Sequence, residues 1–193
     1  MNTLLVGKKA PTFKAQAVAK QQIIHEFTLD LLTEKYIIFF FYPLDFTFVC
    51  PTELHAFQDR LEEFNQLGAE IVGCSVDSVY SHLAWINTSK NKGGIQGISY
   101  PIVSDLNKSI ARDYGVLSED GIAYRGLFLI DKQGIVRHQL VNDLSLGRSI
   151  DETLRLLNAV IFHEQHGEVC PANWVKGSKS MKPSQEGLVA YFN

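Results

Sequence analysis

Cys50 lies where a buried strand would meet a helix, a position that can make a thiol reactive. Before it, residues 36–42 form an apolar run rich in aromatic and β-branched side chains, as in a central strand covered on both faces. After it, Pro51 and Glu53 suit the first turn of a helix, and apolar residues recur at helical spacing over 54–64. The unpaired N–H groups of a helix start favour an anion, which is one recognised way to lower the pKa of a cysteine thiol below about 8.5. The pattern predicts a reactive Cys50 at or next to the N-cap, the alternative being a buried, inert cysteine.

The three cysteines, at positions 50, 74 and 170, are more suited to chemistry than to stapling the fold. An odd number with no C-x-x-C pair argues against a disulfide scaffold and against a thioredoxin-type dithiol. Cys74 falls inside a predicted buried strand, where a cysteine usually serves packing. Cys50 and Cys170 are therefore the candidates for chemistry.

Two other uses of these residues are disfavoured. His163, His166 and Cys170 have ligand-like spacing, but they supply three ligands where a structural zinc site needs four, so no metal is expected. A thiol protease would need a histidine base for Cys50, and His55, five positions along the same helix, would not normally face the thiolate.

The elements that must position these residues alternate in the order of an α/β fold, with helices around a central mixed sheet. Strands are predicted at 12–18, 21–27, 36–42, 70–76, 100–103, 126–131 and 135–141, and helices at 51–66, 79–90, 106–114 and around 185–192. The last two strands are joined by a short turn, as in an antiparallel hairpin. A long helix starts at the capping box formed by Ser149 and Glu152. Residues 1–193 are predicted to form one domain, of which 167–193 is a C-terminal arm.

Length and composition fit one soluble domain. The chain has 193 residues, 46% hydrophobic and 20% charged, which is enough to bury a substantial core. A net charge of −3 with scattered Lys and Arg residues excludes a nucleic-acid footprint. No apolar run approaches the ~18 to 20 residues of a membrane span. We expect no membrane association and a cytoplasmic location.

Residues 42–53, Tyr-Pro-Leu-Asp-Phe-Thr-Phe-Val-Cys-Pro-Thr-Glu, resemble the active-site segment of the typical two-cysteine peroxiredoxins, the thiol-specific peroxidases. The likeness continues in segments 73–78, 81–88, 124–131, 147–152, 169–171 and 191–192, so it covers essentially the whole chain. It implies a thioredoxin-like fold with an N-terminal strand extension and a C-terminal arm. It also implies reduction of hydrogen peroxide and organic hydroperoxides without a bound cofactor.

Peroxide reduction requires groups that hold both oxygens and stabilise the charge on the departing one. Thr47 can place a hydroxyl next to the sulfur of Cys50, and Pro43 can shield the sulfur from water. Arg125 matches the family's Tyr-Arg-Gly pattern and is the candidate guanidinium that favours the thiolate and steadies the leaving oxygen.

Arg148 is the candidate for a second guanidinium, with Glu53 orienting one or both. Each of these residues also has a purely structural interpretation. Thr47 and Pro43 could be turn residues, Arg125 a surface charge at a strand end, Arg148 a residue before a cap, and Glu53 a partner of the helix dipole.

Cys170 lies in a Val-Cys-Pro segment that matches the family's resolving cysteine. The resemblance implies that it attacks the sulfenic acid of Cys50 in a partner subunit and forms an intersubunit disulfide. It further implies a homodimer that assembles into a decamer, with thioredoxin or a flavoprotein disulfide reductase as electron donor. The alternative function is a holdase chaperone or a redox-signalling binding protein.

One segment departs from the family. Peroxide-sensitive members have a Gly-Gly-x-Gly loop that packs against a C-terminal Tyr-Phe helix, which slows the local unfolding that lets the cysteines meet. Here Gly93 and Gly94 are followed by Ile95 and Gln96, and the next glycine is displaced to Gly97. We expect intermediate sensitivity to overoxidation, although the two glycines could simply end a helix.

Overall fold

The chain divides into two compact units after Arg148, and a mixed seven-stranded sheet forms the centre of the larger one. The computed structural model describes residues 4–193. The strands are β1 (Ala15–Ala19), β2 (Gln22–Phe27), β3 (Tyr36–Phe41), β4 (Ala69–Ser75), β5 (Ile102–Ser104), β6 (Arg125–Ile130) and β7 (Val136–Asn142). Their order across the sheet is β2-β1-β5-β4-β3-β6-β7. β4 pairs in parallel with β3 and with β5, and the other four strand pairs are antiparallel. The predicted mixed sheet and the antiparallel hairpin are therefore confirmed.

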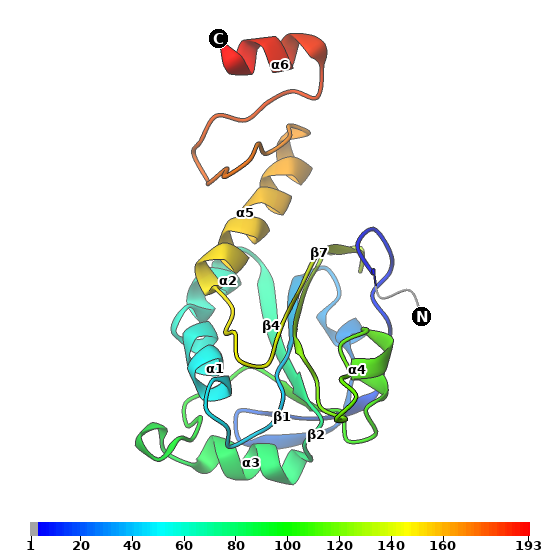
Figure 1. Ribbon diagram of the computed structural model, residues 1–193, viewed down its shortest axis with the longest axis vertical. Coiled ribbons are helices and arrows are strands. Elements are labelled where there is room, and N and C mark those ends of the chain that lie inside the picture. Colours follow the sequence, from blue (N-terminus) through cyan, green and yellow to red (C-terminus); the bar gives the residue numbers. More distant parts are fainter. Residues whose placement is uncertain (1–3) are drawn as a thin grey trace. The chain divides into compact units, whose positions relative to one another are not determined.

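β3 is buried at every position because strands flank it on both edges and helices cover both faces. Successive side chains of a strand point to opposite faces. Phe40 stacks on Phe57 of α1 (Cys50–Asp59), with ring centroids 4.6 Å apart. Phe39 meets Tyr114, directly after α4 (Ser109–Asp113), at 5.0 Å. α1 and α4 therefore lie on opposite faces of the sheet (Figure 1).

Several helices are shorter than their apolar patterns indicate. The helix predicted at 51–66 is divided at Arg60 into α1 and α2 (Leu61–Gln66). α3 (Val79–Asn87) stops before an extended Thr88, and a 3-10 turn, η2 (Lys90–Lys92), follows it. α4 starts only after Lys108, whose φ of +63° is not helical. Another 3-10 turn, η1 (Leu29–Leu32), precedes β3 and was not predicted.

The smaller unit consists of α5 (Ile150–His166), an irregular segment and α6 (Gln185–Phe192). Half of the predicted capping box forms, because the Ser149 hydroxyl accepts from the Glu152 N–H at 3.2 Å. The Glu152 carboxylate instead pairs with Arg155 at 2.6 Å. The irregular segment is fixed to α5 by Arg155, which donates to the carbonyl oxygen of Trp174 at 2.8 Å. Across residues 4–193, no helix combines the length and apolarity needed to cross a membrane.

Candidate active site

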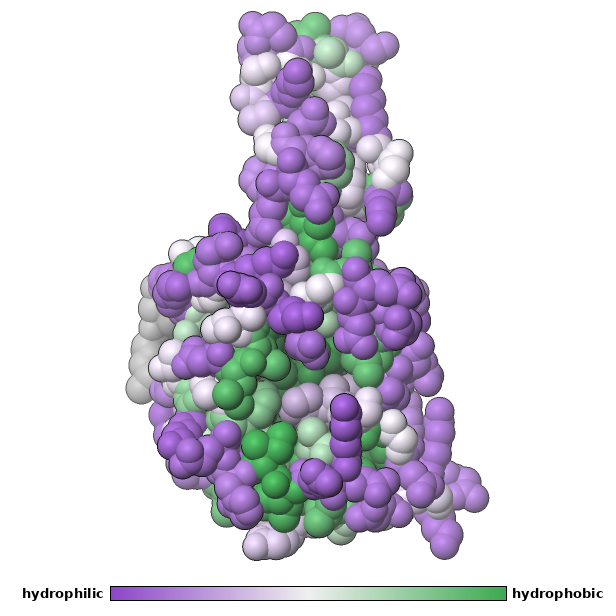
Figure 2. Space-filling view, turned by 180° about the vertical axis from the view of Figure 1, so that it is seen from behind, coloured by the Kyte–Doolittle hydropathy of each residue, from purple (hydrophilic) through white to green (hydrophobic). Residues whose placement is uncertain are grey.

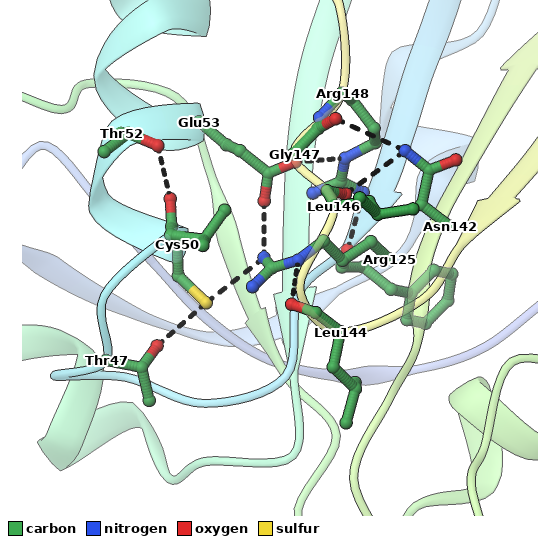
Figure 3. A network of polar contacts seen from close by, with 12 residues as sticks. Thr47, Cys50, Thr52, Glu53, Arg125, Asn142, Leu144, Leu146, Gly147 and Arg148 are labelled. Carbon is green, nitrogen blue, oxygen red and sulfur yellow. Dashed lines mark hydrogen bonds and ion pairs between the residues drawn. The ribbon is translucent and has the colours of Figure 1, made fainter.

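Cys50 is the first residue of α1 and is fully buried. The loop over residues 42–49 leaves the C-terminal end of β3 and turns directly into the helix, so Pro51 takes the second helical position and not the first. The Cys50 Sγ lies 2.9 Å from Thr47 Oγ1 and 3.4 Å from Arg125 Nη1 (Figure 3). Val49 at the N-cap has no side-chain acceptor. The positive end of the helix dipole is therefore not occupied by a capping side chain and acts on Cys50.

Thr47 places its hydroxyl between the sulfur and the loop backbone. The oxygen lies 2.9 Å from Cys50 Sγ and 2.8 Å from the carbonyl oxygen of Leu44, and both are acceptors. A hydroxyl has one proton and two lone pairs, so Thr47 can donate to one partner while it accepts elsewhere. Phe46 just before it has a φ of +55°, an unusual value for a bulky residue, and this turn aims Thr47 at the sulfur.

Arg125 reaches the site because β6 runs antiparallel to β3. Leu127 pairs with Phe40, so the first residue of β6 lies at the end of β3 from which the loop departs. The Arg125 guanidinium is buried, with Nε donating to the Leu144 carbonyl oxygen at 2.8 Å and Nη1 to Glu53 Oε2 at 2.6 Å. Its fixed fork holds Nη1 against the sulfur.

Glu53 joins the two guanidinium groups. Its Oε1 accepts from Arg148 Nε at 2.7 Å and from the Arg148 backbone N–H at 2.9 Å. Arg148 Nη1 donates to the carbonyl oxygens of Phe41 and Gly126 at 2.6 and 2.7 Å. Burial lowers the pKa of Arg148, and the Glu53 carboxylate opposes this shift. Arginine nevertheless stays charged in proteins.

The buried charges of this cluster do not cancel. Arg125 and Arg148 carry two positive charges and Glu53 carries one negative charge, so the group is left with one net positive charge. This net positive charge lies beside the Cys50 sulfur, where it can stabilise negative charge that develops during a reaction.

The structure brings Thr47, Glu53, Arg125 and Arg148 together around Cys50. Pro43 is buried in the same loop, and its shielding of the sulfur stays a prediction.

A buried polar network beneath the loop was not predicted from the sequence. His82 Nδ1 lies 2.8 Å from Asp45 Oδ2, and the Tyr42 hydroxyl donates to Asp45 Oδ1 at 2.8 Å. The Asp45 N–H donates to Asp77 Oδ2 at 2.9 Å. Burial and the nearby Asp45 charge raise the pKa of Asp77. The network ties the loop that carries Thr47 to α3 and to the segment that follows β4.

The other two cysteines have different surroundings. Cys74 is buried in β4, where burial and the nearby Asp105 raise its pKa well above the ordinary value and so keep the thiol neutral. Cys170 is half-buried in the smaller unit, with Sγ 3.6 Å from the Ala159 carbonyl oxygen. Burial raises its pKa, and Arg155 acts in the opposite direction.

Comparison with known proteins identifies the chain. The model of the AhpC/TSA family matches residues 6–139, and that of the C-terminal domain of 1-Cys peroxiredoxin matches 159–193. A chloroplastic 2-Cys peroxiredoxin from Hordeum vulgare is 55% identical over 97% of this chain and 90% of its own length. A thioredoxin peroxidase from Echinococcus granulosus is 53% identical over 98% of both chains. The reduced 2-Cys peroxiredoxin of Plasmodium vivax has a solved structure that superposes with a TM-score of 0.95, at 50% identity and 98% coverage of both chains.

The chain belongs to the 2-Cys peroxiredoxins. The fold is accordingly thioredoxin-like, as expected, and the protein is a thiol-dependent peroxidase. For a 2-Cys peroxiredoxin, the arrangement around Cys50 has a direct chemical meaning: it places a hydroxyl and a fixed positive charge within hydrogen-bonding range of the cysteine sulfur.

Proposed function

We propose that this 2-Cys peroxiredoxin reduces hydrogen peroxide and organic hydroperoxides with the Cys50 thiolate. The observation that carries the proposal is the position of the Cys50 sulfur between the Thr47 hydroxyl and the Arg125 guanidinium. The Arg125 guanidinium is held by further hydrogen bonds to Leu144 and Glu53, so it is oriented before a substrate arrives. Preorganised donors of this kind lower the barrier because they stabilise charge that develops in the transition state.

The first step forms an S–O bond and breaks the O–O bond. The thiolate attacks one peroxide oxygen, and Thr47 and Arg125 hold the two oxygens by hydrogen bonds. The departing oxygen takes the proton of the attacked oxygen and leaves as water or an alcohol, and Cys50 is left as a sulfenate that takes a proton from solvent to become a sulfenic acid. Sulfur has lost two electrons and the peroxide has gained them.

The second step joins the sulfenic acid to the partner subunit's Cys170. The thiolate of that cysteine attacks the Cys50 sulfur, an S–S bond forms as the S–O bond breaks, and the oxygen leaves as hydroxide, which takes the proton released by the Cys170 thiol and becomes water. A dithiol donor then reduces the disulfide. We propose thioredoxin for this role, in line with the name of the Echinococcus relative, with a flavoprotein disulfide reductase as the alternative.

Assembly into a homodimer, and of dimers into a decamer, is part of the proposal. Large apolar side chains are exposed on the larger unit, among them Phe48, Tyr80 and Leu106, which are 92%, 73% and 66% exposed. The face of this unit in Figure 2 shows apolar atoms between hydrophilic ones. Exposed apolar surface of this kind supports contact with another protein.

A cytoplasmic location also stays a prediction, and cell fractionation would test it.

The test is a peroxide assay coupled to NADPH oxidation through thioredoxin and thioredoxin reductase. Wild type and Cys74→Ser should consume peroxide at similar rates, and Cys50→Ser should show none above background. Activity in Cys50→Ser would contradict the proposal. If Cys50→Ser prevents the aggregation of an unfolded client protein to the same extent as wild type, the protein has a holdase activity that does not depend on peroxide reduction. Replacing thioredoxin by a flavoprotein disulfide reductase in the assay distinguishes the two donors.

A further inference from the structure

A cavity of about 600 Å³ lies in the larger unit, at the end of β3 that is far from Cys50. It is lined by Ile37, near the start of β3, and by Ile130, at the end of β6, and these two buried residues pair across the sheet. Cys50 follows the other end of β3. A strand rises about 3.3 Å per residue, so β3 separates the cavity from the loop before Cys50 by roughly 15 to 20 Å. The cavity is therefore not part of the peroxide site.

Three segments that are distant in sequence form the wall, and hydrogen bonds hold them in place. Segment 9–12 is tied to the turn between β6 and β7, because the Ala10 N–H donates to the Gly134 carbonyl oxygen at 2.9 Å. The Pro11 carbonyl oxygen also accepts from the Tyr114 hydroxyl at 3.0 Å. The second segment contains η1, which is capped by the Thr28 side chain. The wall is thus formed before any ligand arrives, as is usual for small-molecule sites.

The lining joins an apolar interior to exposed cations. Apolar atoms come from six residues of all three segments: Ala10, Pro11, Leu29, Leu32, Ile37 and Ile130. Lys9, Lys35 and Lys132 belong to the same lining and are exposed. A molecule inside the cavity would therefore contact apolar side chains at one end and ammonium groups at the other.

Two of the three ammonium groups are held at the wall. Lys9 Nζ donates to the Gln133 carbonyl oxygen, and Lys132 Nζ lies 5.1 Å from the centre of the Tyr36 ring. An ammonium group has three donors, so Lys9 keeps two for another acceptor.

The acidic residues of the lining do not cancel these charges. Asp131 is buried and already occupied, because its Oδ1 accepts from the N–H groups of Gln133 and Ile135 and its Oδ2 pairs with Arg137 at 2.6 Å. Among the lining residues that the structure describes, Asp30 is then the one acid that opposes three lysines. The cavity carries an excess of positive charge.

We propose that this cavity binds a small organic anion with an apolar body, of the class of medium-chain carboxylates. The apolar body would lie against the six apolar residues, and the carboxylate would meet the lysines. The volume falls within the range of about 300 to 1,000 Å³ that is usual for small-molecule sites. The inference goes beyond peroxide reduction, because the ligand binds far from Cys50 and is not consumed.

The test is isothermal titration of the reduced protein with decanoate. Wild type should bind one decanoate per chain. The double variant Lys35→Gln/Lys132→Gln should bind it roughly 3- to 30-fold more weakly, as expected for the loss of two exposed ion pairs. Lys20→Gln/Lys176→Gln makes the same change in net charge at two exposed lysines outside the cavity, and it should bind decanoate as wild type does.

Two further measurements separate the charge from the cavity. Decanol has the same chain without the carboxylate, so it should bind wild type more weakly than decanoate does and should not distinguish wild type from Lys35→Gln/Lys132→Gln. Ala10→Phe places a ring in the apolar part and should abolish decanoate binding. If circular dichroism shows that Ala10→Phe does not fold, Thr12→Phe, at an exposed position of the same wall, replaces it.

Equal decanoate affinity in wild type and Lys35→Gln/Lys132→Gln would overturn the inference. So would binding that does not saturate, which would indicate adsorption to the surface, or unchanged binding in the folded variant that fills the cavity. Titration needs no turnover, and Cys50→Ser should bind decanoate as wild type does. A wild type that consumes no peroxide would therefore contradict the proposed function and leave this test intact.

Discussion

Two buried arginines share one carboxylate beside Cys50, yet their contacts give them different tasks. Arg125 places Nη1 3.4 Å from the sulfur, so its charge acts on the reacting atom. Arg148 donates from Nε to Glu53 and from Nη1 to two backbone carbonyl groups, and its guanidinium lies 5.0 Å from the centre of the Phe40 ring. At the residue scale, replacing Arg125 should therefore lower the rate of peroxide reduction, whereas Arg148 supports the local fold.

Arg125→Met should slow peroxide reduction by about 10² to 10³, since one charge-assisted contact made in the transition state is worth roughly 2 to 4 kcal/mol. Arg112→Met, on the exposed surface of α4, is the control. If the peroxide rate stayed at the wild-type value, Arg125 would not be the guanidinium of the site.

Glu53→Gln should lower the free energy of unfolding by about 3 to 5 kcal/mol, because two buried guanidinium groups would lose their only carboxylate partner within the cluster. Urea denaturation measures the change. Glu62→Gln, an exposed position on α2, should alter stability by less than about 0.5 kcal/mol. Similar losses in both variants would show that the buried pairs do not contribute more than surface charges.

Cys74 should make the folded protein less stable at alkaline pH. Its pKa in the folded state is raised, so the stabilisation is complete below the unfolded pKa of about 8.5 and is lost as pH rises above that value, because only the unfolded chain ionises. The loss approaches about 1.4 kcal/mol per pH unit until the folded pKa is reached. Urea denaturation at pH 7 and at pH 10 should show a smaller difference in Cys74→Ala than in wild type. An equal difference would mean that other groups dominate.

At the scale of elements, α5 offers a separate test through its N-cap. Ser149→Ala removes the acceptor of the Glu152 N–H and should lower the free energy of unfolding by about 1 kcal/mol. Glu152→Gln is the comparison, because the Glu152 carboxylate contacts Arg155 on the surface and should contribute less than about 0.5 kcal/mol. The reverse order of the two effects, measured by urea denaturation, would contradict the observed half of the capping box.

The predicted elements succeed where the signal is local and continuous. β3 is an unbroken apolar run, and the start of α1 is marked by a proline and an acidic residue, so both could be placed from the sequence. The break at Arg60 and the late start of α4 depend on single backbone angles at residues with ordinary side chains. These could not be predicted from periodicity.

The same distinction holds for the site. Thr47 is three residues from Cys50, and the chemistry of a hydroxyl at that spacing could be argued directly. Arg125 and Arg148 arrive from distant segments, and only their likeness to family motifs indicated them. The pair formed by Asp45 and His82 was missed because neither residue has a sequence pattern that identifies its partner.

At the scale of the whole molecule, the oxidised protein should run as a disulfide-linked dimer on a non-reducing gel. The reason is that Cys170 is proposed to resolve Cys50 across a subunit interface. Cys170→Ser should remove the dimer band, and Cys74→Ser, which alters a buried thiol, should keep it. A link between Cys50 and Cys74, found by mass spectrometry of the oxidised protein, would contradict the assignment.

The pairing of β3 with β6 also has a consequence for the newly made chain. Cys50 follows β3 immediately, but Arg125 comes with β6, after β4, β5 and their helices have been synthesised. Contacts between segments so distant in sequence form late in folding. Until β6 docks, the thiol lacks its nearest positive charge. The nascent or partly folded protein should therefore react sluggishly with peroxide, which would protect Cys50 from oxidation before its partner groups are in place.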